Sequence, residues 1–130
     1  MQRFLNAMQP GTYVRPHRHP EPRWELFLTL SGAVVVLEFD GKGCVTQRQE
    51  LLAEGPVRAL ELAPGRWHTV VCMESGSVLF ELKPGPYAPV TDKDFAAWAP
   101  QEGAVGLKAW VECFRQAQPG DCPPRELAVR

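Results

Sequence analysis

Residues 11–32, GTYVRPHRHPEPRWELFLTLSG, decide the fold and carry two of the three histidines in the chain. The third, His68, follows a proline-glycine turn in the segment PGRWH. In an extended strand His17 and His19 project to the same face, because side chains alternate with a period of two. Two imidazoles on one strand can therefore reach a single metal ion.

Glu25 is the fourth candidate ligand, and it stands just after the break at Pro20 and Pro22. With three imidazoles it gives a set of three nitrogens and one oxygen, which suits a first-row divalent ion and leaves coordination positions open. One histidine on an apolar face is usually a core residue, but three at matched spacings beside a carboxylate favour a metal site. We therefore expect one divalent transition metal, with iron, zinc, manganese and nickel all open. The predicted ligands are His17, His19, Glu25 and His68.

The spacing Gly11-x5-His17-x-His19-x5-Glu25-x6-Gly32 resembles the first cupin motif, and Gly65-x2-His68 resembles the core of the second. The gap between His19 and Glu25 is one residue longer than in the general cupin pattern. The wider run PGTYVRPHRHP, WELF, PGRWHTVV and KPGPYAPVTDKDFAAWAP is similar to the WbuC family of cupin-fold metalloproteins, found among polysaccharide (O-antigen) gene clusters. This resemblance implies a cupin barrel that holds its metal through the four residues above.

Composition excludes several classes of function. The 130 residues carry 14 Lys and Arg against 15 Asp and Glu, with no basic cluster, so nucleic-acid binding is not expected. The longest apolar run, residues 26–37, is interrupted by serine and glycine and falls short of the ~20 residues of a membrane helix. We expect a soluble protein with no membrane partner.

The four cysteines are widely spaced and form no CxxC pair, and the opening residues MQRFLNAMQ lack the apolar stretch of a signal peptide. The sequence therefore predicts reduced thiols and a cytoplasmic protein.

Short apolar runs separated by turn residues predict an all-β fold with regular short strands. The stretch Asp40-Gly41-Lys42-Gly43 is a strong hairpin signal between two of these runs. Residues 3–9 are too short to assign. The predicted strands cover residues 12–19, 24–30, 33–39, 44–48, 57–62, 67–73 and 78–83.

The C-terminal part has a different pattern. Residues 84–100 predict an ordered loop anchored by Tyr87, Phe95 and Trp98. After it, four apolar residues at i, i+3, i+4 and i+7 predict one amphipathic helix: Leu107, Trp110, Val111 and Phe114. We expect this helix to pack on its own barrel, with a dimer contact as the alternative.

The whole pattern predicts a small single-domain all-β cupin, a jelly-roll β-barrel with one C-terminal α-helix. The barrel with its loop is expected over residues 1–100, and the helix and tail over 101–130. Because a barrel of this kind has sheet edges that need covering, we also expect a homodimer.

Strand alternation suggests which side chains accompany the metal in a ligand pocket. Tyr13 and Arg15 share parity with His17, Phe27 shares parity with Glu25, and Cys72 shares parity with His68. For Cys72 a buried thiol that acts as a small hydrophobe is the other interpretation. Arg15 would meet either an anionic ligand or a protein carboxylate, for which Glu61 and Glu81 are the candidates. The predicted ligand-binding residues are thus Tyr13, Arg15, Phe27 and Cys72.

These residues leave more than one function open, because a barrel of this type hosts many activities. One hypothesis is an enzyme, either an oxygenase of the non-haem iron type or an isomerase, acting on a small anionic or sugar-derived molecule. A second is a non-catalytic module that binds a carbohydrate or another small molecule through its metal. A third is a purely structural metal.

Overall fold

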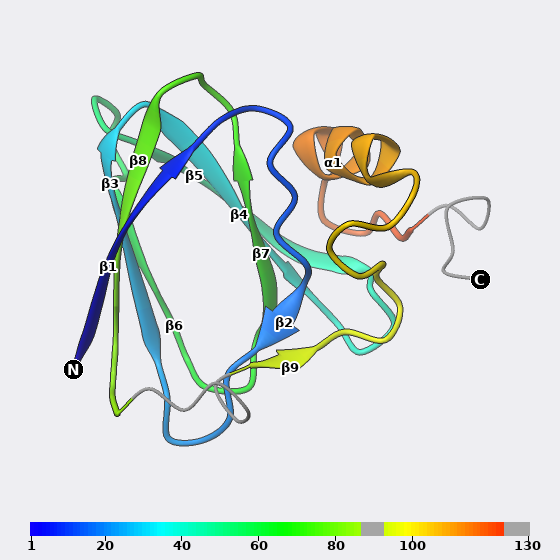
Figure 1. Ribbon diagram of the computed structural model, residues 1–130, viewed down its shortest axis with the longest axis horizontal. Helices are drawn as coiled ribbons and strands as arrows, with labels where there is room; N and C mark the ends of the chain where they lie inside the picture. Colours follow the sequence, from blue (N-terminus) through cyan, green and yellow to red (C-terminus); the bar gives the residue numbers. More distant parts are fainter. Residues whose placement is uncertain (87–92, 124–130) are drawn as a thin grey trace.

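The computed structural model describes residues 1–86 and 93–123, which form two antiparallel sheets and one helix (Figure 1). The first sheet has the strand order β1-β8-β3-β6, with β1 Gln2–Met8, β8 Ser77–Lys83, β3 Glu25–Ser31 and β6 Ala59–Leu62. The second has the order β5-β4-β7-β2-β9, with β5 Val45–Leu52, β4 Ala33–Phe39, β7 Trp67–Cys72, β2 His17–Arg18 and β9 Asp94–Phe95. The helix α1 is Leu107–Gln116. Among the described residues, no helix is long and apolar enough to cross a membrane.

The hydrophobic core lies between the two sheets. Alternate residues of each strand point inward, as the period of two requires. On β3 the inward positions are Glu25, Phe27 and Thr29, all buried, while the residues between them are only partly buried. The apolar members of this core come from both sheets: Met8, Phe27, Val34, Val36, Leu51, Leu62, Val70, Cys72 and Leu79.

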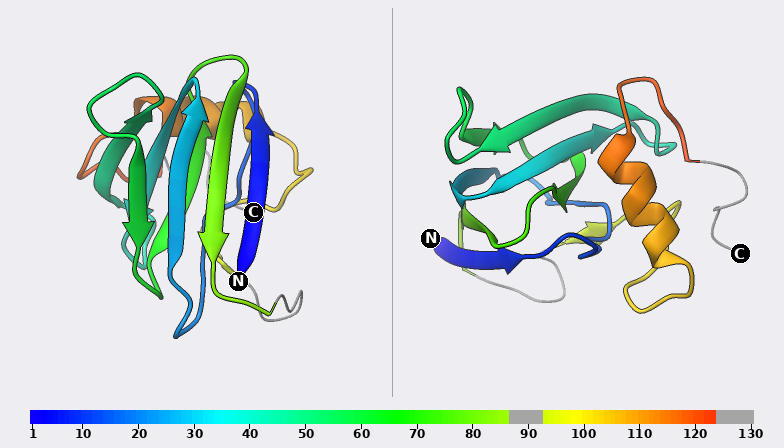
Figure 2. Two further views of the ribbon diagram at one scale, coloured as in Figure 1. Left: turned by 90° about the vertical axis from the view of Figure 1, so that its left-hand side faces the viewer. Right: turned by 90° about the horizontal axis from the view of Figure 1, so that it is seen from above.

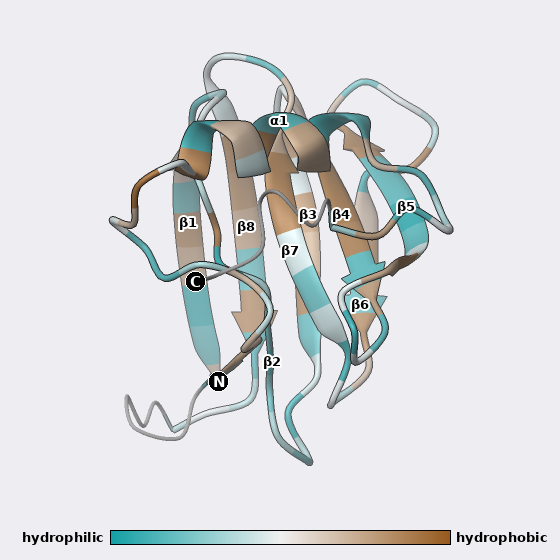
Figure 3. Cartoon of the chain, turned by 90° about the vertical axis from the view of Figure 1, so that its right-hand side faces the viewer, coloured by the Kyte–Doolittle hydropathy of each residue, from teal (hydrophilic) through white to brown (hydrophobic). Residues whose placement is uncertain are grey.

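A second apolar cluster fixes the helix to the outside of the second sheet. Trp110 and Phe114 of α1 pack against Phe39 of β4 and Val71 of β7. Figure 3 shows α1 lying across the hydrophobic parts of β4 and β7, whereas the exposed stretch of β5 is hydrophilic. Both predictions about the helix, its position in the sequence and its packing on its own barrel, are therefore confirmed for the described residues.

Most strands lie where the sequence predicts them, with three main differences. The predicted strand over residues 12–19 is reduced to His17–Arg18, because Pro16 has no N–H to donate to a ladder. Residues 3–9, too short to assign from sequence, fall largely in β1, Gln2–Met8, which pairs along its whole length with β8. The predicted loop over residues 84–100 contributes the short strand β9, and its expected anchor Tyr87 lies outside the described residues. The division of the chain at residue 100 stays a prediction.

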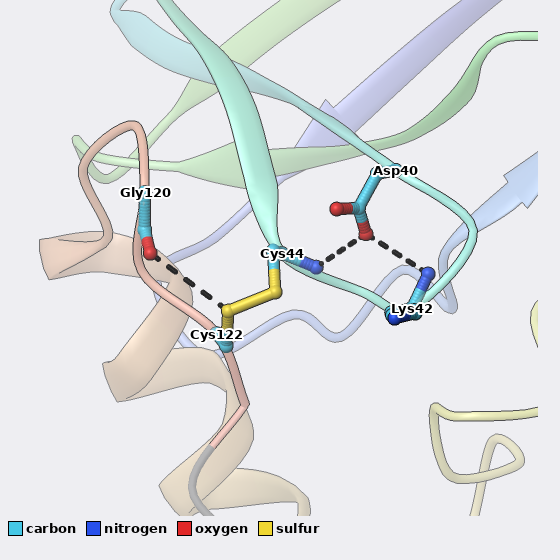
Figure 4. The surroundings of a disulfide bond; sticks show 5 residues. All are labelled: Asp40, Lys42, Cys44, Gly120 and Cys122. Carbon is cyan, nitrogen blue, oxygen red and sulfur yellow. Dashed lines mark hydrogen bonds between the residues drawn. A yellow bond between two sulfur atoms is a disulfide. The ribbon is translucent and has the colours of Figure 1, made fainter.

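A disulfide joins Cys44 to Cys122 and corrects the expectation that all four thiols are reduced (Figure 4). The Asp40 carboxylate shapes the hairpin by accepting hydrogen bonds from the backbone N–H groups of Lys42 and Cys44. The segment after α1 then aligns with β5, because the Val45 N–H donates to the Asp121 carbonyl at 2.8 Å. The two cysteines are 78 residues apart in sequence, so their spacing alone gave no sign of this contact.

Candidate metal centre

The four predicted ligands come together at one point inside the barrel. His17, His19, Glu25 and His68 are all buried, and one ligand atom from each lies within 4.8 Å of the others. His17 of β2 lies directly opposite His68 of β7 in the strand register, and Glu25 begins β3 in the other sheet. The centre therefore bridges the two sheets.

Two turns bring His19 and Glu25 into this centre. The Arg23 N–H donates to the Pro20 carbonyl at 2.9 Å, which closes a turn that absorbs the extra residue between His19 and Glu25. The Gly65 N–H donates to the His19 carbonyl at 2.8 Å and joins the turn before β7 to this segment. Gly65 has a φ of 78°, a left-handed conformation that only glycine adopts at little cost.

The hydrogen bonds of two histidines set their tautomers. Nδ1 of His17 lies 2.8 Å from the Arg15 carbonyl, and Nδ1 of His68 lies 2.8 Å from the Arg66 carbonyl. A carbonyl only accepts, so each Nδ1 carries the proton and each Nε2 keeps its lone pair for a metal. Burial lowers the pKa of both imidazoles, and that of His17 is lowered further by the charge of His68. Both rings are therefore held in the neutral form that binds metals.

Glu25 supplies the negative charge. Burial alone would raise the pKa of its carboxyl, but the hydrogen bond with His19, reinforced by the electrostatic interaction with the nearby imidazoles, outweighs burial and lowers it. One carboxylate oxygen contacts Nε2 of His19, and the other lies 3.9 Å from Nε2 of His68. Nε2 of His68 is buried without a hydrogen-bond partner among the described residues. A cation between these groups would satisfy them all, so the residues present fit a divalent transition metal.

A cavity of about 240 Å³ lies beside the centre and is lined by His17 and Glu25 together with Phe27. Because a water molecule takes up about 30 Å³ of liquid, this space suits a small ligand. Three carboxylates and two ammonium groups also line it: Glu25, Glu81, Glu102, Lys83 and Lys93. Such a mixture of acceptors and donors suits a polyhydroxylated molecule.

Glu81 also lines this cavity, although the sequence predicts it only as a candidate partner for Arg15. It lies opposite Phe27 in the pairing of β3 with β8. Burial, reinforced by the negative charge of Glu25, raises its pKa to about 7. A carboxyl group with such a pKa can both release and accept a proton at neutral pH. Strand alternation could have found it, because Glu81 shares the inward parity of the buried residues Leu79 and Lys83.

Comparison with known proteins identifies the type of fold. The fold is a cupin-like β-barrel. A family model described as Domain of unknown function (DUF6016) matches residues 1–51, which include His17, His19 and Glu25. No curated protein matches the chain.

Three solved structures illustrate the likeness of fold. ChmJ, a 3'-monoepimerase from Streptomyces bikiniensis, has a TM-score of 0.63 at 17% identity, over 72% of this chain and 50% of its own. NovW, a 4-keto-6-deoxy sugar epimerase from Streptomyces spheroides, has a TM-score of 0.61 at 20% identity, over 73% and 50%. The capsular polysaccharide assembling protein CapF from Staphylococcus aureus has a TM-score of 0.61 at 19% identity, over 72% and 27%. The chain spans about half the length of the first two.

Of the predicted ligand-binding residues, only Phe27 lines the cavity. The Tyr13 hydroxyl donates to the Pro100 carbonyl at 2.7 Å, and its ring stacks on Phe114 of the helix. Burial raises the pKa of Tyr13, which lowers its capacity to give up a proton. Cys72 is a fully buried member of the core, in line with its alternative interpretation.

Arg15 is directed toward the segment around β9. Its Nη2 donates to the Ala96 carbonyl at 3.1 Å, and its guanidinium lies 5.1 Å from the centre of the Phe95 ring. Within the described part of the chain it forms no ion pair with Glu61 or Glu81. The parity argument fails for Tyr13 and Arg15 because the residues before His17 are not in a strand.

Proposed function

We propose that the protein is a metal-dependent enzyme that acts on a small sugar-derived molecule. His17, His19, Glu25 and His68 bind one divalent ion, and iron, zinc, manganese and nickel all suit this ligand set. The observation that carries the proposal is the buried three-histidine, one-carboxylate cluster at the wall of a small polar cavity. Arg15 lies away from that cavity, so Lys83 and Lys93, which line it, are the cations that would meet an anionic group of the ligand.

Within the enzyme class, the cavity favours an isomerase over an oxygenase. A divalent ion bound at this centre supplies Lewis-acid polarisation of a carbonyl or hydroxyl oxygen. Glu81, with a pKa of about 7, takes a proton from the carbon next to a substrate carbonyl and returns it to a neighbouring atom. The proton is conserved and no oxidant is consumed, so the step balances within the cavity. The activities named for ChmJ and NovW, both sugar epimerases, support this reaction class.

We also propose that the chain belongs to the WbuC family and takes part in polysaccharide (O-antigen) metabolism. The support is the run of motifs from PGTYVRPHRHP to KPGPYAPVTDKDFAAWAP. The likeness of fold to CapF, a capsular polysaccharide assembling protein, agrees with this context.

Metal analysis and hydrogen exchange test the proposal together. Anaerobically purified protein is analysed for metals, and the metal-loaded protein is then incubated in D₂O with aldoses, ketoses and keto sugar phosphates. We expect about one ion per chain and deuterium at the carbon next to the carbonyl of at least one sugar. Glu81→Gln should abolish exchange with the metal retained. Protein without any metal would contradict the proposal, and sugar binding without exchange would leave the non-catalytic binding module.

The cytoplasm stays our proposed compartment, and the Cys44–Cys122 disulfide provides its test. Persistent disulfides are rare in a reducing compartment. Thiols are alkylated at the moment of cell lysis, and the modified cysteines are counted by mass spectrometry. For a cytoplasmic protein we expect four modified cysteines at lysis, with the Cys44–Cys122 bond closing only on later oxidation. Only two modified cysteines would contradict that location.

A further inference from the structure

The outer face of the first sheet is apolar across three neighbouring strands. Inward positions of β3 and β8 have odd numbers, so even-numbered side chains point out. Every even position of these strands is apolar, and β1 adds two outward apolar residues. This outer face comprises Leu26, Leu28 and Leu30 of β3, Val78, Phe80 and Leu82 of β8, and Leu5 and Ala7 of β1. An antiparallel sheet with one face in water normally carries polar residues there.

None of the described elements covers this face. Figure 2 (left) shows β6, β3, β8 and β1 side by side toward the viewer, with α1 behind them. The helix covers the opposite sheet instead. Leu5, in the middle of the edge strand β1, is 68% exposed, and Leu30, near the end of β3, is 52% exposed, so these two apolar side chains are largely in solvent.

The strand register places one cation and one anion at opposite edges of this face. Arg3 pairs with Leu82, Leu82 with Leu26, and Leu26 with Glu61, so the four residues form one row across β1, β8, β3 and β6. Arg3 and Glu61 are both exposed. Three strand spacings separate them, about 14 Å, so they do not pair within one chain.

We propose that a second copy of this chain packs on the outer face through a two-fold axis that runs along the strands between β8 and β3. Such an axis places β1 of one subunit over β6 of the other at the same height along the strands. Arg3 then faces Glu61 of the partner subunit, and the contact occurs twice. A two-fold axis across the strands would put Arg3 over Ala7 of the partner subunit and gain no charge contact. The apolar centre packs as two aligned sheets do in a sandwich.

The size of the face sets the expected affinity. An outward residue of a sheet occupies about 33 Å², the product of a strand spacing of about 4.8 Å and a two-residue rise of about 6.8 Å. The eight apolar residues with Arg3, Ala59 and Glu61 therefore cover about 360 Å². Two such footprints give about 720 Å², below the ~1,000 Å² that a stable interface normally exceeds, so we expect a weak, transient dimer and take its dissociation constant to lie in the micromolar range.

This inference is independent of the metal and of the proposed reaction. The sequence also predicts a homodimer, and the outer face of the first sheet is the surface proposed for it. The apolar side of α1 is not available for that contact, because Trp110 and Phe114 are already buried against the chain's own barrel.

The experiment measures dimerisation of the full chain by sedimentation velocity between ~1 and ~100 µM, a range set by the expected micromolar affinity. Arg3→Glu alone and Glu61→Arg alone each create two like-charge contacts, so each should weaken the dimer about tenfold. An equimolar mixture of these two variants should dimerise like the wild type, because both contacts again join opposite charges. Lys42→Glu and Glu112→Arg, at exposed positions away from this face, are the matched controls and should change nothing. Phe80→Glu should give a monomer whose circular dichroism is native.

Three results would overturn the proposal. One is a wild-type chain that stays monomeric at ~100 µM, well above the expected dissociation constant. Another is a dimer that tolerates both charge reversals, which would indicate pairing through another surface such as the open edge of β1. The third is a mixture of the two charge variants that does not recover the dimer. The mixing experiment changes only the exposed residues Arg3 and Glu61, so both variants should fold. Its result therefore decides the question even if Phe80→Glu does not fold.

Discussion

His17 and His68 face each other across the pairing of β2 with β7, and their ring centres are 4.5 Å apart. Each ring donates from Nδ1 to a carbonyl two residues earlier in its own segment, Arg15 for one and Arg66 for the other. The two halves of the candidate centre therefore repeat one local arrangement on adjacent strands. This repetition holds both Nε2 atoms ready for a common ion.

Metal binding makes the first prediction. Glu25→Gln should lower the bound metal by at least tenfold, because the amide removes the only negative charge of the ligand set. Glu112→Gln, an exposed carboxylate on α1, is the matched control and should retain the wild-type content. Elemental analysis of dialysed protein makes the comparison, and equal metal content in both variants would exclude this centre.

Removal of the metal should also destabilise the folded state. An ion present at about 100 times its dissociation constant stabilises the fold by about 2.7 kcal/mol, since it binds only the folded chain. Chelation should therefore lower the Tm of the wild type and leave the Tm of His19→Ala unchanged. A wild-type melting curve that does not move after verified metal removal would contradict any contribution of the ion to stability.

Glu81 predicts a pH dependence of stability. Its folded pKa of about 7 lies above the ordinary value of 4.5, so the folded state binds the proton more tightly than the unfolded state does. The stability that this proton contributes is complete below pH 4.5 and is lost as the pH rises through 7. Glu81→Gln cannot ionise, so it should gain stability relative to the wild type between these two values and differ little below them. Urea unfolding at pH 4, 6 and 8 measures the difference, and a gap that does not change with pH would show that Glu81 has an ordinary pKa.

The sequence predicted those elements that are determined by residues close to one another in the chain. The β-rich composition and flanking turns of residues 24–30 and 33–39 predict β3 and β4 almost without reference to the rest of the chain. The helix is equally local, because its apolar residues recur within ten positions. The ligand set could be predicted for the same reason: His17 and His19 are two residues apart, and His68 belongs to a recognisable glycine turn.

Features that depend on long-range register escaped prediction. Strand β1 exists because β8, more than 70 residues later, offers it a complete ladder. Strand alternation marks Glu81 as an inward residue of β8, but its place in the cavity also depends on β8 lying beside β3. Arg15 was assigned to the ligand pocket by extending strand parity past Pro16, where the backbone is no longer a strand. Parity therefore failed before Pro16, although it placed His19 beside His17 even though β2 ends at Arg18.

The disulfide makes the next prediction. Cys44–Cys122 closes a loop of 78 residues, and crosslinks of this kind typically stabilise the fold by about 2 to 4 kcal/mol. A reductant should lower the Tm of the wild type but not that of the double variant Cys44→Ser with Cys122→Ser. Under denaturing, non-reducing conditions the wild type should show two reactive thiols, those of Cys72 and Cys113. Four reactive thiols, with a Tm insensitive to reductant, would mean that the bond does not form.

Arg15 gives the last prediction, because its position separates a structural role from a ligand-binding one. Its guanidinium donates to the Ala96 carbonyl, and the Ala96 N–H donates to the Pro16 carbonyl at 2.9 Å, so Arg15 fastens the β9 segment to β2 beside His17. Lysine keeps the positive charge but lacks the planar guanidinium. In Arg15 that group donates to the Ala96 carbonyl and at the same time lies near the Phe95 ring. Arg15→Lys should therefore destabilise the fold by about 1 kcal/mol, the usual net value of one hydrogen bond, with metal content and the rate of deuterium exchange into substrate unchanged. If Arg15→Lys instead lost deuterium exchange into substrate while its Tm stayed unchanged, Arg15 would have a ligand-binding role rather than a structural one.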